Sequence, residues 1–143
     1  MRLEDIMETN VVTVRPSETV REAALHMQRN DVGALPVVDN GNRVCGIVTD
    51  RDIVTRAIAD GIDPASATVD RVMTDKVVCA APDMQAEDAI RIMAEHKVRR
   101  LPVTNNQGLV GMVSLSDFSE YPLHDAAADT FRSVTQPGGP GLL

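Results

Sequence analysis

Two short segments of the sequence combine a glycine, a hydroxyl side chain and a carboxylate at one spacing. The first segment is Gly46–Asp52 and the second is Gly111–Asp117. In each, an apolar run with β-branched residues gives way to a helical pattern, so the hydroxyl of Thr49 or Ser114 falls at the predicted start of a helix. A helix start presents free N–H groups and a partial positive charge, which together bind anions. These segments are therefore the first candidates for a binding site.

Two interpretations fit this spacing. In the first, Thr49 with Asp52 and Ser114 with Asp117 form capping boxes that satisfy backbone N–H groups. In the second, the hydroxyl donates to a phosphate oxygen, and the carboxylate one turn later accepts hydrogen bonds from the vicinal hydroxyls of a ribose. The two interpretations are compatible, and the presence of the full set in both segments favours the second.

Both segments belong to a longer internal repeat, which fixes the architecture more firmly than local propensity does. The early parts of the repeat recur at an offset of 66 residues and the last part at an offset of 65, so one residue is lost in a turn. We expect repeat 1 over residues 1–62, a linker and lead-in helix over 63–72, repeat 2 over 73–121 and a C-terminal extension over 122–143. The matching pairs are Val11–Pro16 with Val77–Pro82, Leu35–Val37 with Leu101–Val103, and Gly46–Asp52 with Gly111–Asp117.

Each repeat predicts the element order β-α-β-β-α, which places the chain in the α/β class with mixed sheets. The first two strands are expected to be parallel through a right-handed crossover, and the third to pair with the second in a hairpin. One repeat alone buries little surface, so we expect two copies to pack sheet against sheet about a pseudo-twofold axis, leaving a cleft. In repeat 1 the expected elements are a strand over 11–14, a helix from Thr19 with Glu22 in its capping box, strands over 34–38 and 44–49, and a helix over about 50–61. A further helix is expected over 126–134, and a loose tail over 136–141.

The composition and charge of the sequence exclude several classes of protein. Apolar residues make up 43% of the 143 residues and charged residues 24%, as in folded globular proteins. The net charge of -7 disfavours a nucleic-acid partner, and no apolar run approaches the roughly 18 residues that span a membrane. No signal-peptide pattern is present, and the two cysteines show no metal-binding spacing, so we expect a cytoplasmic protein with reduced thiols. Because the sequence offers no nucleophile with its base and no metal cluster, we do not expect an enzyme.

The repeated residues resemble the cystathionine β-synthase (CBS) domain, and two copies in tandem resemble a CBS pair, or Bateman module. The resemblance covers residues 3 to about 120. The residues that carry it are Asp5–Met7, Val11–Val14, Thr19–Ala24, Val32–Val37 and Gly46–Asp52, with Val98–Val103 and Gly111–Asp117 in the second copy.

This resemblance implies a sensor that binds AMP, ADP, ATP or S-adenosylmethionine in clefts between the copies, as a regulatory ligand rather than a required cofactor. By the same resemblance, the carboxylates at the strand-to-helix junctions hold ribose hydroxyls and the hydroxyls there face phosphate. The implied ribose ligands are Asp52 and Asp117, the phosphate-facing hydroxyls are Thr49 and Ser114, the phosphate-binding cations are Arg99 and Arg100 with Arg51 as a further charge, and the base-bracketing residues are Val12, Val14, Val78 and Ala80.

The two copies differ at the positions before the Leu-Pro-Val motif. Repeat 2 has Arg99 and Arg100 there, whereas repeat 1 has Gly33 and Ala34, so we expect one stronger anion site. The leading hypothesis is a homodimeric regulatory module that binds an adenine nucleotide and signals to an unidentified protein. The alternative is a dimeric structural or interaction module that binds no nucleotide.

Overall fold

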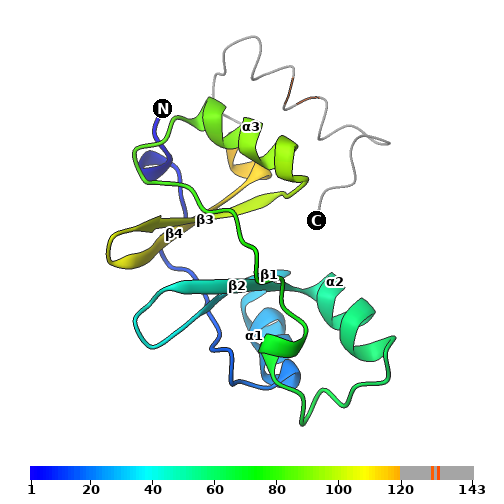
Figure 1. The fold of residues 1–143 in the computed structure, drawn as a ribbon. Coiled ribbons are helices and arrows are strands. Elements are labelled where there is room, and N and C mark those ends of the chain that lie inside the picture. The colour runs from blue at the N-terminus through cyan, green and yellow to red at the C-terminus, as the bar shows by residue number, and fades with distance from the viewer. Residues whose placement is uncertain (120–129, 131, 133–143) are drawn as a thin grey trace. The chain divides into compact units, whose positions relative to one another are not determined.

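The computed structural model describes residues 1–119, 130 and 132 (Figure 1). The chain divides into two compact units. Unit 1 contains residues 1–11, 78–106 and the described residues from 110 onward, and unit 2 contains residues 12–77 and 107–109. The helix expected over 126–134 and the tail expected over 136–141 lie outside the described residues, except for positions 130 and 132.

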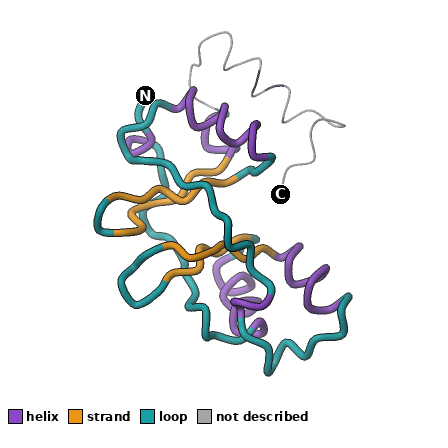
Figure 2. The backbone as a smooth tube through the Cα atoms, in the orientation of Figure 1, coloured by secondary structure: helices purple, strands orange, loops and turns teal. Residues whose placement is uncertain are grey.

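Unit 2 is an α/β unit built on a hairpin. Its two strands are antiparallel, with Leu35 opposite Val48, as the Asn40-Gly41 turn predicts. Strands and helices of the unit are distinguished by colour in Figure 2. The elements of unit 2 are α1 (Val20–Asn30), β1 (Ala34–Val38), β2 (Val44–Thr49), α2 (Asp50–Asp52), the π-helix η2 (Ile53–Ile58) and the 3-10 helix η3 (Val69–Arg71).

Unit 1 repeats this plan with a second two-stranded sheet. Helix α3 covers one side of that sheet (Figure 1). The elements are the 3-10 helix η1 (Leu3–Asp5), α3 (Ala86–His96), β3 (Arg100–Asn105), β4 (Gly108–Ser114) and the 3-10 helix η4 (Leu115–Phe118). The predicted mixed α/β class with two repeats is therefore confirmed, while the packing of the two sheets on each other stays a prediction.

The strand predicted over 11–14 is wrong in extent, because only Val14 pairs, in a parallel bridge with Val37. Val14 N donates to Pro36 O (3.1 Å) and Val38 N donates to Val14 O (2.9 Å). The next bonds of a parallel ladder need the N–H of Pro36 on one side and of Pro16 on the other, and proline has none. Repeat 2 has prolines at the same positions, and it too forms a single bridge, from Ala80 to Val103.

The short helix η1 at the start of repeat 1 packs into the unit formed mainly by repeat 2, and the short helix η3 just before repeat 2 packs into the unit formed by repeat 1. Leu3 is fully buried in the core of unit 1, and its N–H donates to Met84 O (2.9 Å). Val69 is fully buried in the core of unit 2, and its N–H donates to Glu18 O (2.8 Å). Each hydrophobic core therefore combines residues of one repeat with a short helix from elsewhere in the chain.

Helix α1 begins with the predicted capping box. Glu22 N donates to Thr19 Oγ1 (3.1 Å), and Thr19 N donates to Glu22 Oε2 (2.9 Å). Helix α3 has Gln85 at the same position, and this side chain makes no capping bond; its Oε1 accepts from the amino group of Met1 (2.9 Å). The two matched helices therefore differ in how their first turn is satisfied.

This difference predicts unequal effects of the two caps on stability. Thr19→Ala is expected to lower the free energy of unfolding by about 1 kcal/mol, because it leaves a helix N–H without its acceptor. Gln85→Ala, the matched control, is expected to cost only a few tenths of a kcal/mol, because no capping bond is lost. Urea denaturation of the two variants measures both values. Equal losses would show that the cap at Thr19 contributes nothing beyond side-chain replacement.

Candidate functional site

The strand-to-helix junction of unit 2 forms the capping box that the sequence predicts. Asp52 N donates to Thr49 Oγ1 (3.1 Å), and Thr49 N donates to Asp52 Oδ2 (2.9 Å). Asp52 is only 8% exposed, and its Oδ1 lies 3.8 Å from Arg56 Nε. Both oxygens of this carboxylate are therefore already engaged within the unit, which confirms the capping interpretation here.

The corresponding junction of unit 1 leaves more hydrogen-bonding capacity. Ser114 N donates to Asp117 Oδ2 (2.8 Å), while Ser114 Oγ lies 2.9 Å from Ser116 Oγ. Asp117 is half-buried, and among the described residues its second oxygen has no ion-pair partner. This carboxylate therefore makes a capping bond through one oxygen, and its binding of a ribose through the other stays a prediction.

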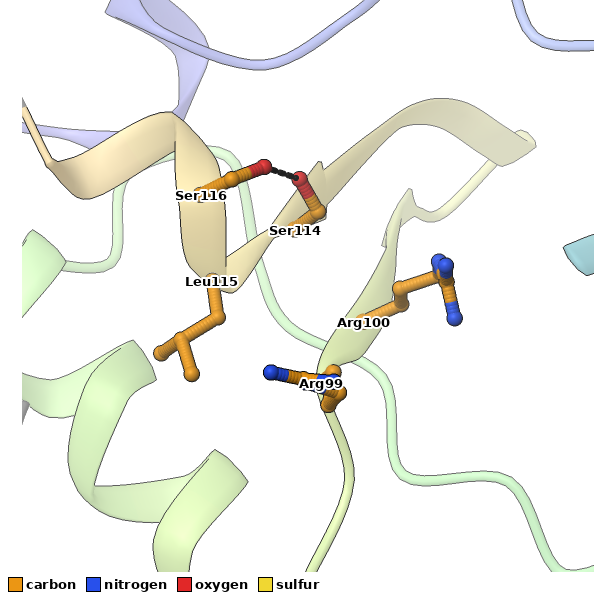
Figure 3. A pocket seen from close by; sticks show the side chains of 5 residues that line it. All are labelled: Arg99, Arg100, Ser114, Leu115 and Ser116. Carbon is orange, nitrogen blue, oxygen red and sulfur yellow. Dashed lines mark hydrogen bonds between the residues drawn. The ribbon is translucent and has the colours of Figure 1, made fainter. Parts of the chain in front are cut away.

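A cavity of about 270 Å³ opens beside this junction in unit 1 (Figure 3). Arg99 extends toward Leu115, whereas Arg100 extends in the other direction, as consecutive residues at a strand do (Figure 3). Within the described part of the chain neither guanidinium forms an ion pair. The cavity is therefore positively charged and edged with hydroxyl groups. Its lining residues are Arg99, Arg100, Ser114, Leu115 and Ser116.

One backbone hydrogen bond fixes the cavity's two sides to each other. Leu115 N donates to Arg99 O (2.8 Å), which ties the start of η4 to the segment before β3. The same bond exists in unit 2, where Asp50 N donates to Gly33 O (2.9 Å). A Cβ atom on Gly33 would lie 3.0 Å from Asp50 Oδ2. Repeat 1 thus has a carboxylate where repeat 2 has Leu115, so the two junctions differ in charge.

The other predicted site residues take different positions. Arg51 is exposed at the start of α2, and Val12 and Val78 are half-buried. Val14 and Ala80 are 1% and 3% exposed and lie in the two cores, with their N–H and C=O groups used by the parallel bridges. That these four residues bracket a base stays a prediction.

Sequence reasoning missed two residues of the cavity, Leu115 and Ser116. A signal for Ser116 was present, since a second hydroxyl follows Ser114 by two residues. In repeat 1 the matching position is Arg51, so this second hydroxyl is not part of the repeated pattern.

Both cysteines are poor nucleophiles in this fold. Burial raises the pKa of the Cys79 thiol, and a hydrogen bond with Thr104 offsets part of that effect. Burial, followed by the nearby charge of Asp39, raises the pKa of Cys45. Since the thiolate is the reactive form, both residues are mainly protonated at neutral pH. Both cysteines are free and partly buried.

The fold and the site together define a tandem-repeat module of the α/β class, with a charged cavity at one strand-to-helix junction. The CBS domain family matches the chain twice, at residues 3–58 and 69–124. The chain therefore belongs to the CBS domain family and carries a pair of these domains.

Relatives of similar length support this membership. The CBS domain-containing protein YhcV of Bacillus subtilis is 41% identical over 126 residues, which cover 88% of this chain and 89% of that protein. The solved structure of Hypoxic Response Protein I has a TM-score of 0.79 at 34% identity and covers 86% of this chain and 100% of that one. The CBS domain pair of protein MJ0100 has a TM-score of 0.75 at 26% identity over 83% of this chain and 93% of that chain.

Two of these solved structures contain bound groups. The MJ0100 pair was solved with 5'-methylthioadenosine and S-adenosyl-L-methionine, and Hypoxic Response Protein I with two coordinated zinc ions. In this chain, the described residues contain no group of three or more His, Cys, Asp or Glu side chains that could hold a metal ion. No helix among them is long and apolar enough to cross a membrane.

Proposed function

We propose that this protein is a regulatory CBS-pair module that binds an adenine nucleotide, with the phosphates held in the cavity beside η4. The observation that carries this proposal is that Arg99 and Arg100 line one cavity with Ser114 and Ser116 and have no ion-pair partners within the described residues. Unpaired guanidinium groups beside hydroxyl groups are well suited to phosphate oxygens, because each contact is a charge-assisted hydrogen bond or a donated hydroxyl.

The cavity is large enough to hold only part of a nucleotide. At about 270 Å³ it is smaller than the roughly 300–1,000 Å³ of a whole small-molecule pocket. A phosphate group needs only a fraction of that space. The nucleoside must then extend along neighbouring residues. The second oxygen of Asp117, which has no ion-pair partner among residues 1–119, 130 and 132, follows the Ser114 hydroxyl by one turn and can accept from the ribose. Half-buried Val78 offers an apolar contact for the base.

Two further features support the proposal. A member of the same family, the MJ0100 pair, binds adenosine ligands. In addition, Asp50 occupies the junction of repeat 1 where repeat 2 has an apolar side chain, so the phosphate site is expected in unit 1 alone. Homodimerisation and signalling to an unidentified regulated protein complete the proposal, and no catalytic step is part of it.

Calorimetric titration with ATP, ADP, AMP and S-adenosylmethionine tests the proposal. We expect a phosphorylated nucleotide to bind with one site per chain. Arg100→Gln is expected to weaken that binding about tenfold, because it removes a charge-assisted bond to phosphate. Arg29→Gln is the matched control: it removes the same charge from an exposed position on α1 and is expected to leave the affinity unchanged. Asp117→Asn is expected to weaken binding of the ribose by a similar factor.

Three results would contradict the proposal. Absence of binding by all four compounds would favour the structural or interaction module instead. Equal weakening by Arg100→Gln and Arg29→Gln would show that net charge alone attracts the nucleotide. Unchanged affinity in Asp117→Asn would show that this carboxylate does not contact the ribose.

A further inference from the structure

Unit 1 contains a second, larger cavity that shares no residue with the proposed phosphate site. Its volume is about 610 Å³. It lies among the lead-in helix, the segment before α3 and the end of β3. Its lining residues are Arg2, Glu4, Ala81, Pro82, Asp83, Thr104, Asn105 and Asn106.

The internal duplication shows a side-chain contact at the matching positions of unit 2. There Arg15 Nη1 donates a hydrogen bond to Asn40 Oδ1. At the offset of 66 residues, Arg15 corresponds to Ala81 and Asn40 corresponds to Asn106. Unit 1 therefore keeps the amide that accepts the guanidinium but has lost the arginine that supplies it. Both Ala81 and Asn106 line the cavity, so an arginine at position 81 would start from its wall.

The lining also provides two solvent-exposed acceptors, on Asp83 and Asn106. Among the described residues, the side chains of Asp83 and Asn106 have no hydrogen-bond or ion-pair partner. Glu4 is paired with Arg2 at 3.1 Å, so that carboxylate and that guanidinium neutralise each other. Asp83 corresponds to Ser17 in unit 2, so the charge at this position is specific to repeat 2. The net charge of the lining is negative, which favours a cation.

We propose that this cavity binds the arginine side chain of a partner protein. A guanidinium carries five N–H donors in one plane, and it can therefore donate to the Asn106 amide oxygen and the Asp83 carboxylate together. The occupant in unit 2 is a side chain on a polypeptide, which is why we assign a protein rather than a free metabolite. This inference does not depend on nucleotide binding, since the residues and the ligand are different.

Nuclear magnetic resonance of the Asn106 side-chain amide tests the inference on the full chain. The probe is N-acetyl-arginine N-methylamide, which presents the side chain as a polypeptide does, and its citrulline analogue is the neutral isostere. We expect saturable shifts of the Asn106 amide with the arginine probe and an affinity at least about tenfold lower with citrulline. The Asn40 amide serves as an internal control, because Arg15 already occupies its oxygen.

Two variants separate this proposal from non-specific attraction. Ala81→Arg restores the side chain found in unit 2 and is expected to abolish the response of Asn106 to the probe. Asp83→Asn, which adds no bulk, is expected to weaken binding of the arginine probe without abolishing the fold. The proposal is overturned if the probe shifts nothing, if citrulline binds equally well, or if Ala81→Arg leaves the affinity unchanged. Tighter binding of free L-arginine than of the capped probe would overturn the assignment to a protein partner.

Discussion

Leu3→Ala is expected to destabilise the unit formed by the second repeat, although Leu3 lies at the other end of the sequence. Leu3 is fully buried in the core that contains Ile90, Met93 and Phe118. Truncating it removes buried methyl groups and leaves a cavity, which costs about 2–5 kcal/mol of unfolding free energy for a leucine in a packed core. Chemical denaturation measures this loss.

The matched variant is Val69→Ala, which alters the equivalent lead-in position in unit 2. Its loss is expected to be smaller, because valine carries fewer side-chain carbons. Native-state hydrogen exchange locates each effect. Leu3→Ala should lower the protection of α3 and β3, and Val69→Ala that of α1 and β1. If Leu3→Ala lowered the protection of α1 instead, the exchange of lead-in helices between the repeats would be refuted.

Gly46→Ala is expected to cost about 1–3 kcal/mol, as inserting a methyl group into a packed region does. A Cβ atom at this position would lie 2.5 Å from Met73 Sδ and 2.9 Å from the backbone oxygen of Thr74. Met73 can change its rotamer, but Thr74 O accepts a hydrogen bond from Ile47 N (2.9 Å) and cannot move without breaking it. The cost is therefore steric and arises from the backbone.

Gly111→Ala provides the matched comparison in unit 1. There the added Cβ would lie 2.5 Å from Met7 Sδ, but the nearest backbone atom, Glu8 O, is 3.1 Å away. Because only the flexible side chain has to move substantially, the loss should be smaller than for Gly46→Ala. Urea denaturation of both variants checks this order, and the double variant Gly46→Ala with Met73→Ala should recover only part of the stability. Full recovery, or a larger loss at Gly111, would show that the backbone contact is not limiting.

Features set by neighbouring residues were predictable from the sequence. The capping box of Thr19 and Glu22 and the hairpin at Asn40-Gly41 depend on local spacing, and both form as expected. The extent of the first strand was not predictable from its own residues, because Pro36 on the partner strand ends the ladder. The packing of Leu3 into unit 1 depends on contacts between distant parts of the chain, which leave no local pattern.

The candidate site, like the fold, could be predicted from the sequence only in part. The duplication pointed to Ser114 and Asp117, and the family resemblance pointed to Arg99 and Arg100; the structure brings the two arginines and Ser114 to one cavity. Sequence reasoning could not show that both oxygens of Asp52 are engaged, while one oxygen of Asp117 has no ion-pair partner in the described part of the chain. That difference depends on the position of Arg56 in unit 2, which only the folded chain reveals.

The crossed lead-in helices also set an order of events during protein synthesis. The hydrophobic core of unit 2 needs no residue beyond about Met73, so it can close while the ribosome is still adding the second repeat. The core of unit 1 requires both Leu3 and Phe118. Helix η1 must therefore wait for its packing partners, with Leu3 unburied, until almost all of the described sequence has been translated.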